Sequence, residues 1–157
     1  MADELTRARD HAARALSSRD RTVFEMRSFL ERKRVEPSVI DEVVEDLCET
    51  GTLDDANYAM RFAEDKRSLA GWGSQRIERD LARRGVASAH VEAAIAALGS
   101  DDERHTAMEL LERRFPHSLA DDRERDRAWR VLVRRGFEPE LAYEAIRAHE
   151  RGLGRVA

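Results

Sequence analysis

Apolar residues recur along this chain every three or four positions, which is the spacing of helices that bury one face. No segment alternates apolar and polar residues over the length of a strand. Glycines and prolines separate the apolar stripes into nine predicted helices, of which the first, seventh, eighth and ninth cover residues 3–16, 101–115, 121–135 and 139–151. The pattern therefore predicts an all-α protein.

Several predicted helices carry a recognisable start. Thr22 is followed three positions later by Glu25, which is the arrangement of a capping box. Proline fits the first turn of a helix, so Pro37 marks another start. Further N-caps are expected at Asp54-Asp55 and at Ser74, because short polar side chains accept hydrogen bonds from the free N–H groups of a first turn.

One segment recurs at a constant interval. Leu81-Ala82-Arg83-Arg84-Gly85-Val86 reappears 51 positions later as Leu132-Val133-Arg134-Arg135-Gly136-Phe137, and a rougher copy stands 51 positions earlier as Leu30-Glu31-Arg32-Lys33-Arg34-Val35. The interval predicts three tandem three-helix repeats, residues 1–51, 52–99 and 100–157, the last with a frayed tail from residue 152. Such units cannot bury their apolar faces alone, so we expect them to stack into an elongated, curved array.

Apolar positions match between the three repeats. The equivalent sets are Leu30, Leu81 and Leu132; Val35, Val86 and Phe137; and Val44, Ile95 and Ile146. Leu47 and Leu98 are matched by His149, a difference that is typical of a terminal repeat with a neighbour on one side only.

Composition excludes several classes of protein. The 157 residues carry a net charge of -4, so the whole chain does not bind nucleic acid as a polycation would. Cys48 is the only cysteine, which excludes a disulfide framework, and its apolar neighbours predict that it is buried. The five histidines lack metal-ligand spacing and no catalytic constellation is present, so we expect no metal, no cofactor and no enzymatic activity. The absence of an apolar leader and of a membrane-spanning run predicts a cytoplasmic protein, which we expect to be a monomer.

Charge is unevenly distributed along the chain. Residues 36–55 hold eight acidic groups and no basic one, whereas the second helix of each repeat is basic. One face of that helix carries matched arginines in the second and third repeats, namely Arg76, Arg79 and Arg83 and, 51 positions later, Arg127, Arg130 and Arg134. Core packing does not require arginines in register, so we interpret the two rows as a surface for phosphates or for a partner's carboxylates. The candidate binding residues are these six together with Arg32, Lys33, Arg84 and Arg135.

Other interpretations of these residues stay open. The rows can be a solvated helix face, neutralised by the acidic neighbours Glu78, Asp80, Glu124 and Asp126. Shared ancestry of the repeats also accounts for matched arginines without a function. Trp72 lies between two glycines and is either an exposed anchor or part of the core, whereas Trp129 is predicted to be buried.

Short motifs follow one another through the middle repeat, in the order Leu53-Asp54-Asp55-Ala56-Asn57-Tyr58-Ala59, Phe62, Gly71-Trp72-Gly73-Ser74-Gln75-Arg76-Ile77 and Leu81-Ala82-Arg83-Arg84-Gly85-Val86. Their order and spacing resemble the signature of the RecX family, bacterial regulators of the recombinase RecA. The first repeat agrees at Arg19-Asp20-Arg21-Thr22, at Glu25-Met26 and at Leu30, and the resemblance covers roughly residues 8–150. Ser74 departs from the family, which often has proline at that position.

The resemblance implies an array of three-helix modules that binds in the groove of the RecA filament on single-stranded DNA. It further implies that the protein limits strand exchange, ATP hydrolysis and co-protease activity by RecA. The filament is then the expected partner, with weak direct DNA binding in addition and no membrane partner. Two other functions stay open: a helical protein that acts directly on DNA, and an adaptor whose acidic residues 36–55 hold a basic partner.

Overall fold

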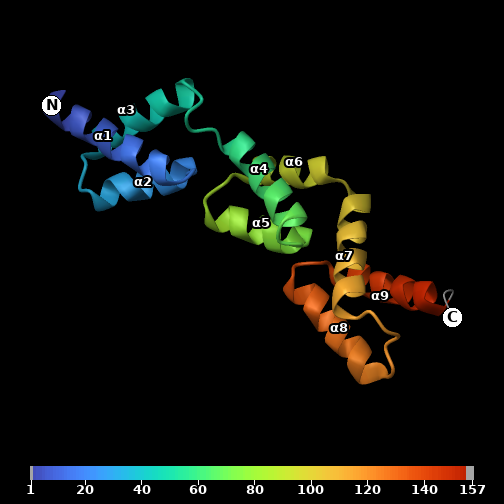
Figure 1. Cartoon of the computed structure of the whole chain (residues 1–157). Coiled ribbons are helices and arrows are strands. Elements are labelled where there is room, and N and C mark those ends of the chain that lie inside the picture. Colours follow the sequence, from blue (N-terminus) through green and yellow to red (C-terminus); the bar gives the residue numbers. More distant parts are fainter. Residues whose placement is uncertain (1, 155–157) are drawn as a thin grey trace. The chain divides into compact units, whose positions relative to one another are not determined.

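The computed structural model describes residues 2–154, and over this range it contains nine α-helices and no strand, which confirms the predicted fold class (Figure 1). The helices are α1 (Ala2–Ser18), α2 (Val23–Arg32), α3 (Pro37–Glu49), α4 (Asp55–Ser68), α5 (Ser74–Arg83), α6 (Ser88–Leu98), α7 (Ser100–Arg114), α8 (Asp122–Arg134) and α9 (Pro139–Gly154). None of these helices is long and apolar enough to cross a bilayer.

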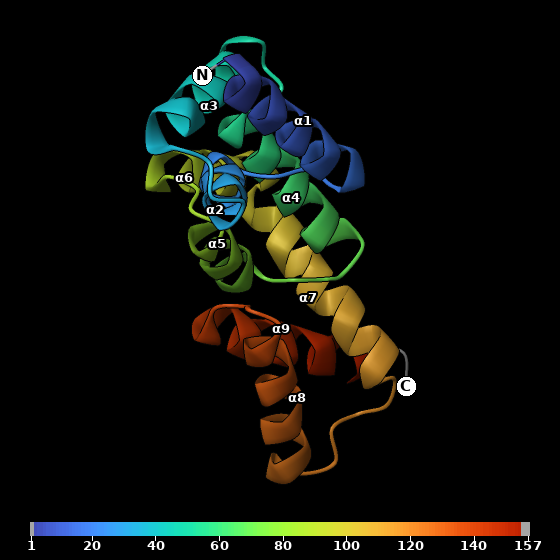
Figure 2. The ribbon, with the colours of Figure 1, turned by 90° about the vertical axis from the view of Figure 1, so that its left-hand side faces the viewer.

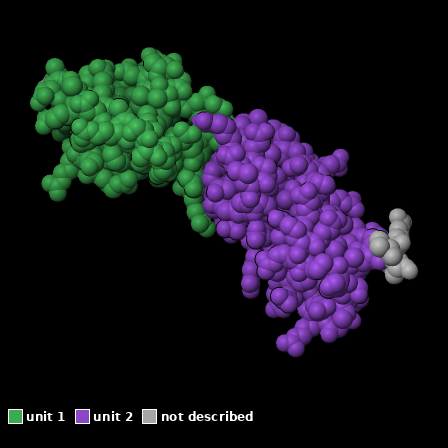
Figure 3. All heavy atoms as spheres, in the orientation of Figure 1, with its two compact units in different colours: residues 1–59, 81–91 green, residues 60–80, 92–157 purple. Residues whose placement is uncertain are grey.

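The chain forms two compact units (Figure 3). The first consists of residues 1–59 and 81–91, and the second of residues 60–80 and 92–157. The middle repeat is therefore shared, because α4, α5 and α6 each begin in one unit and continue in the other.

Each unit has its own apolar core. In the first unit α1, α2 and α3 pack against one another, and in the second unit α9 packs against both α7 and α8 (Figure 2). Matched positions occupy the two cores, since Leu30 and Leu132 are both fully buried and Val44 and Ile146 are nearly so. The predicted apolar stripes therefore do face the interior.

Helix starts follow the sequence signals with one exception. Thr22 and Glu25 form the predicted capping box, and Pro37 opens α3 in its first turn. The Asp54 carboxylate accepts a hydrogen bond from the Asn57 N–H at 3.0 Å, as an N-cap does. The prediction that Ser74 caps α5 is wrong, because Ser74 is the first residue of that helix and its hydroxyl donates to the Glu103 carboxylate on α7.

The recurring segment forms the same helix ending in all three repeats. The N–H groups of Val35, Val86 and Phe137 donate to carbonyls five positions earlier at 3.2, 3.1 and 3.1 Å, which is the pattern of a Schellman motif. The residue before each has a positive φ: 60° at Arg34, 80° at Gly85 and 93° at Gly136. Glycine adopts this conformation without a steric penalty, whereas arginine does not.

Replacing Arg34 with glycine is expected to raise the free energy of unfolding by about 0.5–1 kcal/mol. Glycine relieves a left-handed conformation that costs a side chain about 1–2 kcal/mol, and the larger backbone entropy that glycine loses on folding offsets part of this gain. Urea denaturation followed by circular dichroism measures the change. Arg32→Gly, two residues earlier at the end of α2, is the matched control and is expected to lower stability by about 1 kcal/mol. An R34G protein no more stable than the parent contradicts the prediction.

Two burial predictions are wrong, each because helix orientation overrides local composition. Cys48 is exposed at the end of α3, and partial burial together with the carboxylates of Asp54 and Asp55 raises the pKa of its thiol. Trp129 is 36% exposed on α8.

The C-terminal end differs in two ways from the expectation. His149 is buried where the other repeats have leucine, and its Nε2 lies 2.7 Å from the Phe115 carbonyl at the end of α7. A polar ring is accommodated there because that carbonyl has no partner within the helix. Helix α9 continues to Gly154, so residues 152–154 are helical, and the rest of the predicted frayed tail lies outside the described residues.

Candidate partner-binding surface

The Arg84-Gly85 turn after α5 docks on the start of α2 within the first unit. The Thr22 hydroxyl donates a hydrogen bond to the Arg84 carbonyl. A Cβ added to Gly85 would lie 2.3 Å from the Cβ of Phe24, so the close approach requires glycine in addition to the positive φ. This turn thereby ties the end of α5 to the beginning of α2.

The Arg84 side chain strengthens the same contact. Its Nη1 donates to the Tyr58 hydroxyl at 3.0 Å and lies 3.8 Å from the Glu25 carboxylate. Burial raises the pKa of the Tyr58 hydroxyl, and the neighbouring Arg84 charge opposes this shift only in part. Arg84 therefore contacts groups of its own chain.

The second unit repeats this arrangement 51 positions later. The Gly73 N–H donates to the Arg135 carbonyl at 2.8 Å, and the Gln75 N–H donates to the Gly136 carbonyl at 3.0 Å. The Arg135 Nη1 donates to the Ala70 carbonyl at 2.8 Å. Arg84 and Arg135 thus stabilise two equivalent junctions: the first joins the turn after α5 to the start of α2, and the second joins the turn after α8 to the start of α5. The sequence pattern alone did not distinguish this structural role from partner binding.

Each junction also contains a carboxylate from the first helix of the next repeat. At the first, the Asp55 carboxylate on α4 accepts from the Val23 N–H at 3.0 Å. At the second, the Glu103 carboxylate on α7 accepts from both the N–H and the hydroxyl of Ser74, each at 2.9 Å. Negative charge is favourable at the N-terminus of a helix, so these acids cap α2 and α5 from outside.

Arg67 is a buried cation at the second junction and is 3% exposed. Its guanidinium donates to the Trp72 carbonyl at 2.8 Å, to the Ser74 hydroxyl at 2.9 Å and to the Asp102 carboxylate at 3.1 Å. Three partners, two in the segment 72–74 and one on α7, satisfy the charge, as burial requires. Sequence reasoning missed Arg67 because the carboxylate that pairs with it, that of Asp102, lies 35 positions away on α7.

The α5 row, Arg76, Arg79 and Arg83, begins on an aromatic support. The Arg76 guanidinium lies 3.8 Å from the centre of the Trp72 ring, and the Lys66 ammonium lies 4.8 Å from the same centre. The Phe62 ring meets Trp72 edge to face at 6.3 Å. Trp72 is thus half-buried and orients the first arginine by a cation–π contact, whereas Arg79 and Arg83 are exposed.

The α8 row, Arg127, Arg130 and Arg134, is exposed along its length. Among the described residues, none of the three forms an ion pair with a carboxylate. The nearby Glu124 carboxylate instead accepts from the Ala120 N–H at 2.7 Å, next to the N-cap of α8. The neutralisation considered from the sequence therefore does not occur through Glu124.

The remaining candidates, Arg32 and Lys33, are exposed at the end of α2. The Lys33 ammonium lies 5.7 Å from the centre of the Phe29 ring. Within residues 2–154 no cluster of histidine, cysteine or carboxylates has the geometry of a metal site. What the surface offers is a set of guanidinium groups at helical spacing, which suits phosphate or carboxylate groups repeated along a partner.

Family models and relatives agree in covering almost the whole chain. The models for the first, second and third three-helix domains of RecX match residues 8–47, 54–95 and 101–146. A protein of Deinococcus radiodurans named regulatory protein RecX is 35% identical over 87% of this chain, and the match spans 65% of that relative's own length. One from Trichlorobacter lovleyi with the same name is 33% identical over 83% of this chain and 87% of its own.

Solved structures share the arrangement of helices. The crystal structure of RecX from Lactobacillus salivarius superposes with a TM-score of 0.85 at 20% identity, covering 96% of this chain and 99% of that one. A second crystal structure, of a regulatory protein RecX, superposes with a TM-score of 0.81 at 20% identity. The match covers 94% of this chain and 74% of the chain in that structure. At this identity the likeness supports the fold.

Proposed function

The chain belongs to the RecX family, and on this premise we propose that it binds the RecA filament on single-stranded DNA and inhibits its recombinase, ATPase and co-protease activities. Residues 1–51, 52–99 and 100–157 act in this proposal as three modules of one cytoplasmic regulator. The protein is not an enzyme in its own right and acts through the filament.

The exposed α8 row is the observation that carries the proposal. Three arginines on one helix face stand without an intramolecular carboxylate among the described residues. A nucleoprotein filament presents phosphates and acidic side chains at regular intervals, and arginine binds both with paired hydrogen bonds. The exposed row offers such groups a continuous contact along one helix.

In the proposal, the α5 row and the end of α2 supply further contacts with the filament. Trp72 holds the Arg76 guanidinium in place, which lowers the entropic cost of fixing that side chain against a partner. Arg32 and Lys33 add two exposed cations in the first module. Arg84 and Arg135 contribute indirectly. Their hydrogen bonds hold the turns at which α5 and α8, the helices that carry the two rows, come to an end.

The test is whether the purified full-length chain slows ATP hydrolysis by RecA on single-stranded DNA. We expect inhibition that saturates at a fixed ratio of this protein to RecA. Undiminished hydrolysis at saturating protein contradicts the proposal. Tight binding to bare DNA that falls steeply with salt supports direct action on DNA instead, and a pull-down dominated by a partner other than RecA supports an adaptor.

A further inference from the structure

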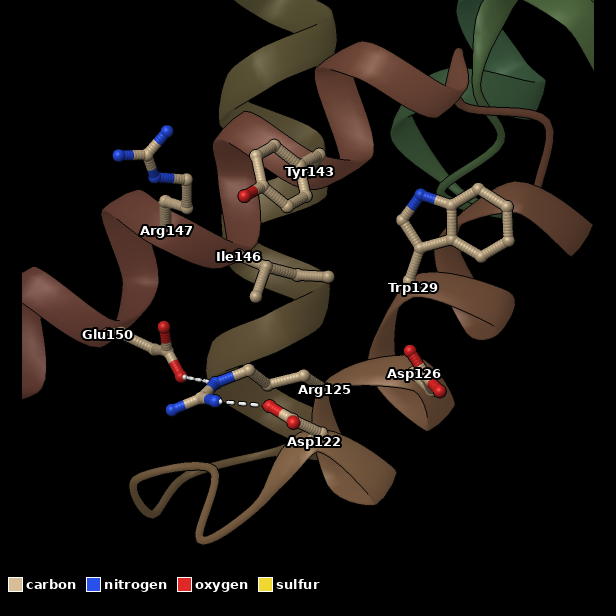
Figure 4. Close-up of a pocket in the computed structure, with 8 residues that line it drawn as sticks. All are labelled: Asp122, Arg125, Asp126, Trp129, Tyr143, Ile146, Arg147 and Glu150. Atoms are coloured by element: carbon tan, nitrogen blue, oxygen red, sulfur yellow. Dashed lines mark hydrogen bonds and ion pairs between the residues drawn. The ribbon is translucent and has the colours of Figure 1, made fainter.

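An open groove lies between α8 and α9, on a part of the third module that the arginine row does not use (Figure 4). The side chain of Ile146 lies at its base, and Trp129 and Tyr143 flank it from the two helices. The Trp129 Nε1–H donates to the Pro139 carbonyl at 3.2 Å, so the polar edge of the indole already has a partner. Tyr143 is 58% exposed.

One end of the groove is lined by a triad of charged side chains. The Arg125 guanidinium donates to the Glu150 carboxylate at 2.7 Å and to the Asp122 carboxylate at 2.8 Å (Figure 4). These hydrogen bonds, that to Glu150 above all, raise the pKa of Arg125. Two carboxylates against one guanidinium leave the triad with a net negative charge.

A further carboxylate stands beside Trp129. Asp126 lies one turn before the tryptophan on α8, is exposed and, within the described residues, has no cationic partner for its side chain. The remaining cation of the lining, Arg147, lies 5.6 Å from the centre of the Tyr143 ring, so three carboxylates face two guanidinium groups. The groove therefore combines aromatic walls, an apolar base and an excess of negative charge.

We propose that this groove is a docking site for a basic side chain, an arginine or lysine carried by a partner protein. The cation would stack on the Trp129 and Tyr143 rings and pair with the Asp126 carboxylate, which are the groups that recognise ammonium and guanidinium ions. A nucleic acid fits less well, because its phosphates would meet Asp122, Asp126 and Glu150. The site is distinct in charge from the arginine rows and does not depend on the identity of the partner proposed above.

Intrinsic fluorescence tests this proposal, since Trp129 is the only tryptophan left in a Trp72→Phe full-length chain. The probe is the peptide acetyl-Ala-Arg-Ala-Arg-Ala-amide, and its neutral counterpart carries citrulline in place of arginine. We expect a saturable change in Trp129 emission with the arginine peptide, a dissociation constant on the order of 1 mM, and no change with the citrulline peptide. Asp126→Asn in the same background is expected to weaken binding about fivefold.

The matched control is Glu144→Gln, which removes an exposed carboxylate from α9 outside the groove and is expected to leave binding unchanged. Circular dichroism verifies that each variant keeps its helices. Equal binding of the citrulline peptide, equal binding by D126N, or no response to either peptide overturns the proposal. A response to an oligothymidylate rather than to the arginine peptide overturns it as well, and assigns the groove to nucleobases.

Discussion

Replacing Arg127, Arg130 and Arg134 together with alanine is expected to raise the concentration needed for half-maximal inhibition of RecA's ATP hydrolysis by about 10- to 100-fold. Each exposed ionic contact with a partner contributes about 0.5–1 kcal/mol, and the loss of three gives a change of this size. The fold should be unaffected, because all three side chains are exposed and the helix core beneath them is formed by other residues.

The matched control removes the same number of charges from the same module. Arg104, Arg113 and Arg114 are exposed on α7, and among the described residues they have no ion-pair partner. Their replacement by alanine is expected to change inhibition less than twofold. If both triple variants weaken inhibition equally, net charge rather than the α8 row decides binding, and the assignment of the row is wrong.

The salt dependence of inhibition separates the two kinds of contact. If the row contacts phosphates of single-stranded DNA, log affinity decreases with log salt concentration. The steepness of this decrease should become smaller by about 0.7 for each contact removed. Contacts to carboxylates of RecA would release fewer condensed ions and change the slope less. The comparison needs only the parent and the triple variant at several salt concentrations.

Gly136→Ala is expected to lower the free energy of unfolding by about 2–5 kcal/mol. The backbone there has φ of 93°, which costs an alanine about 1–2 kcal/mol. The added Cβ would also lie 2.5 Å from the Arg76 backbone nitrogen, and relieving such an overlap costs a further 1–3 kcal/mol, roughly. Both penalties fall on the junction where Gly73 and Gln75 donate to the turn.

Gly152→Ala is the control for this prediction. Gly152 lies within α9 with nothing within 4 Å of an added Cβ, so alanine there should stabilise the helix by about 0.5–1 kcal/mol. Urea denaturation of the two variants measures the difference. A G136A protein as stable as the parent contradicts this prediction and would show that the turn moves freely away from α5.

The sequence by itself determined the helices, most of their starts and ends, and the repeat. These features depend on residues one or two turns apart: the capping box joins Thr22 to Glu25, and the Schellman motifs join residues five positions apart. The arginine rows follow from the same periodicity, because an α-helix places positions i, i+3 and i+7 on one face. Family membership followed from the order of the short motifs, and the family models cover the same residues.

Only the tertiary structure separated the roles of the arginines. Arg83 and Arg84 are neighbours in one motif, but Arg84 meets Tyr58 26 positions away, and Arg135 meets Ala70 65 positions away. The same holds for Glu103, which caps α5 from 29 positions away, and for the exposure of Cys48 and Trp129. Contacts of this kind depend on which helices pack together, and side chains that look equivalent along one helix become different once another helix covers one of them.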